Sequence, residues 1–153
     1  MEPRLNPFLA APDEMQAWLA YSIGLHDSGL EPSLMNLVMM RASQINGCAV
    51  CLNMHSAEAR KLGETEQRLY LLDAWRDSPL YSERERAALG WTEALTRLAG
   101  SHVSDDVYRA FSAQFSEAEQ VKVTLLIVAI NGWNRINAGF RTAHPVGNDR
   151  LAA

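Results

Sequence analysis

The residues best suited to chemistry are both cysteines of the chain and one of its four histidines, arranged as Cys-x-x-Cys-x-x-x-His. A helix turns by about 100° per residue, so Cys48, Cys51 and His55 would share one helical face, within about 60° of one another. The preceding Asn46-Gly47 pair is a turn signal, which predicts that Cys48 lies near the N-terminus of a new helix. The unpaired N–H groups and positive dipole end at that place favour a thiolate over a thiol.

This arrangement is suited to redox chemistry on a dithiol. A thiolate is the nucleophile that attacks a peroxide or a disulfide, and an oxidised cysteine can then close a disulfide with a nearby second thiol. His55 lies one helical turn after Cys51, where its imidazole can accept the thiol proton or supply a proton to a leaving group. The segment therefore predicts a redox dithiol with its own base, and its catalytic candidates are Cys48, Cys51 and His55.

Two other interpretations of these residues stay open. In one, the cysteines are buried and the histidine is a hydrogen-bonded member of a core face. In the other, the three side chains bind zinc, and the fourth ligand would have to be His26, His102 or His144. None of these histidines belongs to a ligand-like pair, and the only two cysteines of a chain seldom fall at this spacing by chance. We therefore favour the dithiol and expect no metal.

Length and composition indicate one globular domain over residues 1–153, with 48% hydrophobic and 21% charged residues. The net charge of −4 and the lack of a basic cluster argue against nucleic acid as a partner. No apolar run approaches the roughly 20 residues that span a bilayer, and the first residues lack the pattern of a signal peptide. We expect a cytoplasmic protein without a membrane partner, a setting in which a Cys-x-x-Cys is more often catalytic or metal-binding than structural.

The periodicity of apolar residues predicts an all-α protein of about six or seven helices, without strands or internal repeats. Residues 1–11 are expected to form an extended lead-in, and the tail from Thr142 is expected to be irregular. Ser82 and Ser116 each begin a capping-box pattern, and Gly63 is expected to end the cysteine helix. The last long helix is almost wholly apolar in its middle, which is typical of a helix in the core or between subunits. The predicted helices cover approximately 12–26, 32–46, 48–62, 65–75, 82–98, 105–114 and 116–139.

The cysteine segment and its flanks also resemble a known family. The resemblance begins with Arg41-Ala42-Ser43-Gln44-Ile45-Asn46-Gly47-Cys48-Ala49-Val50-Cys51, followed by Met54-His55, and continues through 59–66, 82–89 and 130–135. These stretches look like the signature of the AhpD-like alkylhydroperoxidases of the carboxymuconolactone decarboxylase superfamily, and the resemblance covers most of the chain.

This resemblance implies one copy of the AhpD-like helical fold, assembled into homotrimers or homohexamers. It also implies a peroxidase that reduces organic hydroperoxides with its cysteine pair and is regenerated by a dithiol such as a lipoylated protein, without metal, haem or flavin. In that scheme Cys51 forms the sulfenic acid, Cys48 closes the disulfide, and His55 is the base for Cys51.

One residue departs from the family pattern, which has a glutamate twelve positions before the first cysteine, where this sequence has Asn36. Asparagine can hydrogen-bond but cannot ionise or relay a proton. Either a nearby acid such as Glu31 or Glu58 takes over, or the protein is a slow peroxidase. Because neither acid has the matching helical position, we favour the second alternative on the sequence alone.

Two other activities compete with the peroxidase. The superfamily also contains enzymes of decarboxylation or lactone chemistry that lack the cysteines, so the presence of Cys48 and Cys51 argues against that activity. The second competitor is a redox sensor, or a general thiol–disulfide protein, with little peroxidase turnover. A sensor reacts once with peroxide, whereas an enzyme consumes peroxide catalytically when a reductant is supplied.

Overall fold

The computed structural model describes residues 2–100 and 102–145, and in these residues the chain forms only helices, turns and irregular segments. The predicted all-α class is confirmed, with one α-helix more than the upper expected count. The helices are α1 (Pro7–Ala10), α2 (Pro12–Gly24), η1 (Leu25–Asp27), α3 (Pro32–Asn46), α4 (Ala49–Lys61), α5 (Glu66–Leu71), η2 (Leu72–Asp77), α6 (Glu83–Thr96), α7 (Asp105–Ser112) and α8 (Glu117–Phe140), where η denotes a 3-10 helix.

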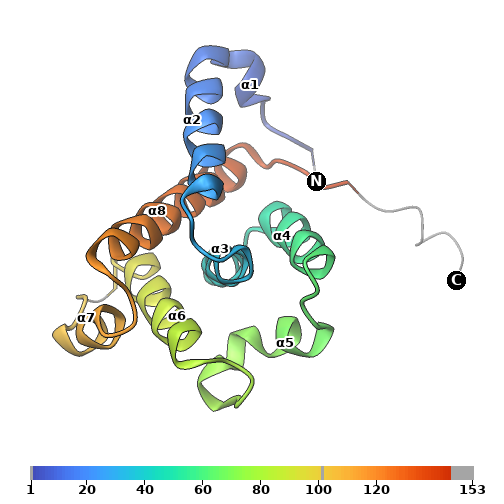
Figure 1. Cartoon of the computed structure of the whole chain (residues 1–153). Coiled ribbons are helices and arrows are strands. Elements are labelled where there is room, and N and C mark those ends of the chain that lie inside the picture. The colour runs from blue at the N-terminus through green and yellow to red at the C-terminus, as the bar shows by residue number, and fades with distance from the viewer. Residues whose placement is uncertain (1, 101, 146–153) are drawn as a thin grey trace, which may run out of the picture.

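Helix α3 is the centre of the fold. Figure 1 shows α3 end-on, with α4, α6 and α8 placed around it, and α3 contacts all three helices. Its apolar side chains point in nearly all directions, and every residue from Leu34 to Ser43 is buried. A helix that is apolar over so wide an arc is stable only when other helices cover it. Because α3 leads directly into α4, this packing fixes the position of the cysteine segment.

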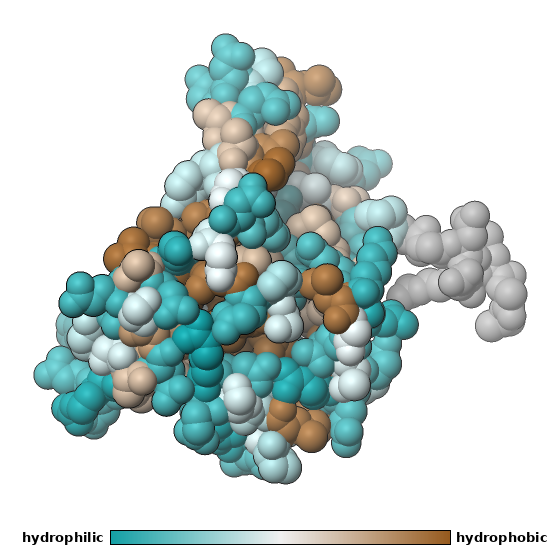
Figure 2. Space-filling model, viewed as in Figure 1, coloured by the Kyte–Doolittle hydropathy of each residue, from teal (hydrophilic) through white to brown (hydrophobic). Residues whose placement is uncertain are grey.

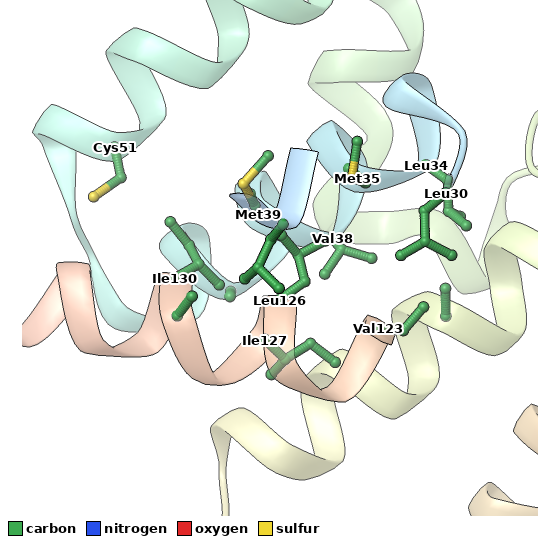
Figure 3. Packing of buried hydrophobic residues seen from close by; sticks show 14 of the residues in the cluster. Leu30, Leu34, Met35, Val38, Met39, Cys51, Val123, Leu126, Ile127 and Ile130 are labelled. Atoms are coloured by element: carbon green, nitrogen blue, oxygen red, sulfur yellow. The ribbon is translucent and has the colours of Figure 1, made fainter. Parts of the chain in front are cut away.

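The main core cluster reaches from the start of α3 to the cysteines. Figure 3 shows Val38 and Met39 of α3 packed against Leu126, Ile127 and Ile130 of α8, with Cys51 at the edge of the cluster. The sulfur of Cys51 therefore lies at a boundary of the core rather than in its middle.

Local signals account for most helix ends. Ser82 and Ser116 each form the predicted capping box with a glutamate three residues on, and Gly63 adopts a left-handed conformation with φ 92° just after α4.

Two expectations were wrong. The lead-in contains α1, because Asn6 caps the amide of Phe8 at 3.0 Å and Pro7 occupies the first helical position.

The second difference lies between residues 65 and 77, where one helix over 65–75 was expected. Helix α5 ends at Leu71 and continues as the 3-10 helix η2, in which Ala74 has non-helical angles of φ −106° and ψ 26°. Tertiary packing decides this change, because Leu72 and Trp75 must both be buried in a second, smaller core cluster. The apolar spacing alone does not distinguish a straight helix from a bent one.

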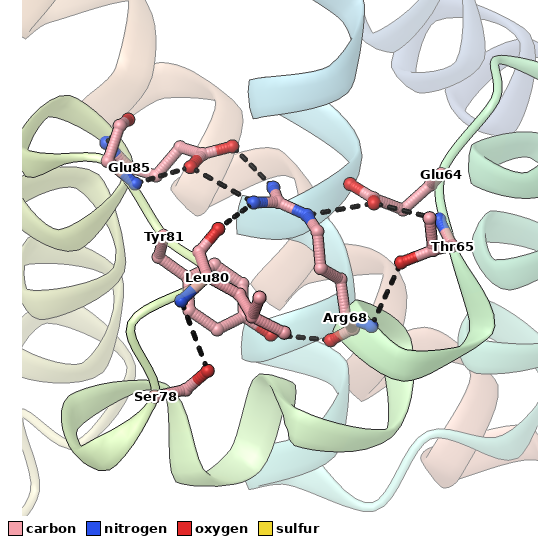
Figure 4. Close-up of polar contacts among 8 residues, drawn as sticks. Glu64, Thr65, Arg68, Ser78, Leu80, Tyr81 and Glu85 are labelled. Atoms are coloured by element: carbon pink, nitrogen blue, oxygen red, sulfur yellow. Dashed lines mark hydrogen bonds and ion pairs between the residues drawn. The ribbon is translucent and has the colours of Figure 1, made fainter.

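Two arginine clusters join the segments around α3. Arg68 of α5 lies between Glu64 and Glu85 and also binds the carbonyl of Leu80 (Figure 4). In the second cluster, the buried Arg41 of α3 donates from Nε to Glu93 of α6 at 2.8 Å. A buried cation of this kind is tolerated because it is paired. These ion pairs account for the charged residues on α3 and α6 that the apolar pattern of those helices does not explain.

Helix α2 projects from the body of the molecule in Figure 1, and η1 at its base contacts α8. A Cβ placed on Gly132 would lie only 2.5 Å from Cζ2 of Trp18, so the absence of a side chain at Gly132 lets the indole approach α8. The indole of Trp133 also donates to Ser22 at 2.9 Å. These contacts fix the end of α2 that faces the cysteine helix.

The surface carries one notable apolar stripe. Val121, Leu125 and Val128 recur at helical spacing on α8 and are exposed, and Figure 2 shows hydrophobic surface where α8 runs. Among the described residues, none of the helices combines the length and apolar character needed to cross a membrane.

Candidate active site

The candidate catalytic residues are set by the junction between α3 and α4. Gly47 has a left-handed φ of 65°, a conformation that glycine adopts without the strain of a side chain, and the amide of Cys48 bonds to Ser43 at 2.9 Å. Cys48 is the N-cap residue of α4, with φ −87° and ψ 94°. This geometry agrees with the prediction that Cys48 lies where a new helix begins.

The structure brings Cys48, Cys51 and His55 together on one buried face of α4. Their exposed fractions are 5%, 1% and 4%, respectively, and both cysteines are free thiols. Desolvation at such sites normally disfavours charge, so the identity of the groups that surround the sulfurs decides whether a thiolate can form.

The two thiols form a coupled acid pair. The thiol of Cys51 donates to the Cys48 sulfur and thereby lowers the pKa of Cys48 to about 6, with further donation from Asn134 and Asn137 and against the opposing effect of burial. The same hydrogen bond raises the pKa of Cys51, as do burial and the Cys48 charge. The pair thus loses one proton easily and the second with difficulty, which gives one shared thiolate near neutral pH.

Amide side chains from α8 surround this thiolate. Asn137 donates from Nδ2 to the Cys51 sulfur at 3.4 Å, and Asn134 is fixed by donation to Ser43 at 3.1 Å and by acceptance from Asn46 at 2.9 Å. Asn46 also donates to Asn131 at 3.0 Å. Because Asn46 links the buried Asn131 and Asn134, these two amides are oriented before any charge forms.

His55 is buried on the same face, one turn beyond Cys51. Burial lowers the pKa of its imidazole, while the carboxylate of Glu58 opposes this effect and His26 adds to it. Nδ1 of His55 lies 3.4 Å from Oε2 of Glu58, although no aligned hydrogen bond to Nδ1 forms among the described residues. A histidine with a lowered pKa is neutral at pH 7 and can accept a proton.

A cavity of about 390 Å³ opens onto these residues. Its walls are mostly apolar side chains of α2, α3, α4 and α8, while Ser22, His26, Glu58 and Asn137 add polar groups. Cys51 and His55 line the cavity, and Cys48 does not. A small apolar molecule with one polar group suits a cavity with this lining, and Cys51 is the sulfur that such a molecule would meet.

Sequence reasoning missed Asn137, and it considered Glu58 only as a substitute for the family glutamate. Asn137 lies 86 positions after Cys51, and no short motif signals that α8 returns to the cysteines. Asn36 is buried, and its Nδ2 donates to the carbonyl of Pro32 at 3.1 Å. Glu31, the other acid considered, instead pairs with Arg84 at 2.9 Å.

The zinc interpretation finds no ligand set in residues 2–100 and 102–145. In this part of the chain, no three side chains among His, Cys, Asp and Glu come close enough together to hold a metal ion.

Comparison with known proteins relates this geometry to a family. Residues 12–94, which include both cysteines and His55, match the model of the carboxymuconolactone decarboxylase family. The uncharacterized protein YdfG of Bacillus subtilis (strain 168) is 37% identical over 137 residues, which are 90% of this chain and 93% of YdfG.

Two solved structures share the fold. ATU0492 of Agrobacterium tumefaciens, a protein of unknown function and candidate antioxidant defence protein AhpD, superposes with a TM-score of 0.92 at 45% identity, over 95% of this chain and all of that chain. The debrominase Bmp8 superposes with a TM-score of 0.80 at 20% identity, over 88% of this chain and 73% of Bmp8. The second likeness concerns the fold alone.

Proposed function

This chain belongs to the carboxymuconolactone decarboxylase family, and from that premise we propose that it is a thiol-dependent peroxidase for organic hydroperoxides. The observation that carries the proposal is the position of the Cys51 sulfur, which faces an apolar cavity beside the neutral imidazole of His55. The apolar wall would take the organic group of a hydroperoxide, and the sulfur and imidazole would meet its oxygen atoms.

The first step is attack by Cys51 as a thiolate on the outer oxygen of the hydroperoxide. The O–O bond breaks, the sulfur is oxidised to a sulfenic acid, and the organic oxygen leaves as an alkoxide. His55 takes the thiol proton before the attack and returns it to the alkoxide, which leaves as an alcohol. Asn137, at 3.4 Å from the Cys51 sulfur, stabilises the thiolate before it reacts.

The second step uses Cys48. Its sulfur attacks the sulfenic acid of Cys51, a disulfide forms, and water leaves. A dithiol, such as the dihydrolipoyl group of a lipoylated protein, then reduces the disulfide and is itself oxidised. The cycle needs no metal, haem or flavin, and it suits a reducing compartment such as the cytoplasm.

The low pKa of Cys48 and the position of Cys51 in the cavity favour different first nucleophiles. We assign the attack to Cys51, because a nucleophile must reach its substrate and Cys48 does not line the cavity. The Cys51 thiol keeps its proton more tightly than Cys48 does, so the attack requires a base for Cys51, the role that we assign to His55 one helical turn away.

Steady-state consumption of a bulky organic hydroperoxide, with dihydrolipoamide as the reductant, tests the proposal. We expect many turnovers per protein molecule for the parent and none for Cys51→Ser. Without the reductant, Cys48→Ser should react once and stop as the sulfenic acid. A parent protein that reacts once and then stops, although reductant is present, would instead identify a redox sensor.

A further inference from the structure

The imidazole of His55 needs a group that holds its orientation. The side chain at position 36 cannot supply a charged group for this purpose. A buried histidine that acts as a base is normally oriented through its second ring nitrogen. Position 36 carries an amide, whose Nδ2 is used by the carbonyl of Pro32 at 3.1 Å. The remaining Oδ1 of Asn36 can accept a hydrogen bond but cannot carry a negative charge.

Glu58 is the acid that faces the imidazole. It lies three residues after His55 on α4, its Oε2 is 3.4 Å from Nδ1, and its side chain lines the cavity with an exposed fraction of 43%. In the described residues, His55 is the only cationic or potentially cationic group within ion-pair distance of Glu58. Several other glutamates are committed to arginines instead: Glu31, Glu64, Glu66, Glu85, Glu93 and Glu119.

We propose that Glu58 is the positioning residue of this site: its carboxylate holds the Nδ1–H tautomer of His55 and stabilises the imidazolium during proton transfer. The inference rests on the proposed peroxidase function and adds to it a Cys51–His55–Glu58 relay in which the acid comes from α4 rather than from α3. With the proton on Nδ1, the free electron pair is on Nε2, which is then the atom that accepts the Cys51 proton.

The relay conserves protons at each step. Nε2 takes one proton from the Cys51 thiol, and the ring becomes a cation beside the Glu58 carboxylate. After the thiolate has cleaved the O–O bond, Nε2 gives that proton to the alkoxide, and the ring is neutral again. Catalytic hydrogen bonds often become short only when substrate binds, so the 3.4 Å between Nδ1 of His55 and the Glu58 carboxylate is compatible with this role.

His26 affects the protonation of His55 in the direction opposite to Glu58. It lines the cavity from η1 and, when charged, disfavours the His55 cation. The charged groups that act on the pKa of His55 are therefore Glu58 on its own helix and His26 on η1, while the Cys51 thiol lies one turn earlier and lines the same cavity. Of these two charged groups, only Glu58 favours the imidazolium.

The test compares Glu58→Gln with Glu66→Gln. Both changes remove one negative charge, and the two carboxylates are similarly exposed, at 43% and 45%, but Glu66 pairs with Arg60 rather than with His55. The first measurement is an NMR titration of His55 in the reduced protein. Glu58→Gln should lower the pKa of His55 because the opposing carboxylate is lost, Glu58→Asp should restore part of the difference, and Glu66→Gln should match the parent.

The second measurement is kcat/KM against pH for hydroperoxide reduction. Glu58→Gln should lower the maximum by about tenfold, the lower end of the effect of removing a group that orients a functional histidine, and should move the acid limb to lower pH. A loss of activity without a moved limb would indicate a purely structural role and overturn the proposal.

An unchanged His55 titration in Glu58→Gln would also overturn it. The NMR measurement needs no turnover, so the role of Glu58 can be decided even if the parent protein proves inactive with hydroperoxides. Inactivity of the parent would count against the peroxidase function, whereas an unmoved His55 titration would count against the relay.

Discussion

Replacement of Asn137 by leucine isolates the contribution of α8 to the reactivity of the dithiol. Leucine keeps the approximate size of the side chain but removes the donor that lies 3.4 Å from the Cys51 sulfur. A hydrogen bond to a charged group contributes about 1.5–3 kcal/mol. Because sulfur is a weak acceptor and Asn134 also donates, we expect about 1.4 kcal/mol, a tenfold change in the ionisation equilibrium.

The assay is alkylation of the reduced protein by iodoacetamide, followed as a function of pH. Loss of a donor to the thiolate raises the pKa of Cys48 above its value of about 6, so the variant should react about fivefold more slowly at pH 6 and about tenfold more slowly well below it. The difference should vanish at high pH, where both proteins carry the thiolate. Asn53→Leu, an exposed change on α4, should follow the parent, and superimposable profiles for parent and Asn137→Leu would refute the reasoning.

Three further changes test other parts of the account. His55→Ala should lower hydroperoxide turnover by roughly 10²-fold, the usual scale for loss of a general base, and a turnover equal to the parent's would make His55 structural. Gly132→Ala should destabilise the protein by about 1–3 kcal/mol, because its Cβ would lie 2.5 Å from the Trp18 ring. Gly139→Ala, with open space around it, should not destabilise the protein. Chemical denaturation compares the free energies of unfolding of the two variants. We expect a trimer or hexamer that uses the apolar stripe of α8, so Val128→Glu should reduce the mass measured by sedimentation, and a parent that sediments as a monomer would contradict this.

Local sequence signals were sufficient for most helix ends and for the place of the cysteines, but not for α1 or η2. The capping boxes at Ser82 and Ser116 and the glycines at 47 and 63 act through neighbours within a few residues, so their effect can be read without a fold. The break at Ala74 could not be read in this way, because it follows from burying Leu72 and Trp75 in a cluster built from distant helices.

The same distinction applies to the candidate site. The spacing of Cys48, Cys51 and His55 lies within one helix and is visible in the sequence. Asn137 approaches Cys51 only because α8 packs across α3 and α4. Glu58 was visible as an acid three residues after His55, but the expectation of an acid at position 36 directed attention to α3. The side-chain geometry adds that the Glu58 carboxylate lies 3.4 Å from Nδ1 of His55.

The most direct test of the proposed dithiol cycle is peptide mass spectrometry of the reduced protein after treatment with one equivalent of an organic hydroperoxide. The account predicts a disulfide between Cys48 and Cys51, seen as the loss of two hydrogen atoms from the peptide that contains both residues and reversed by a dithiol. Unmodified thiols, or only sulfinic and sulfonic acid at either cysteine, would contradict it.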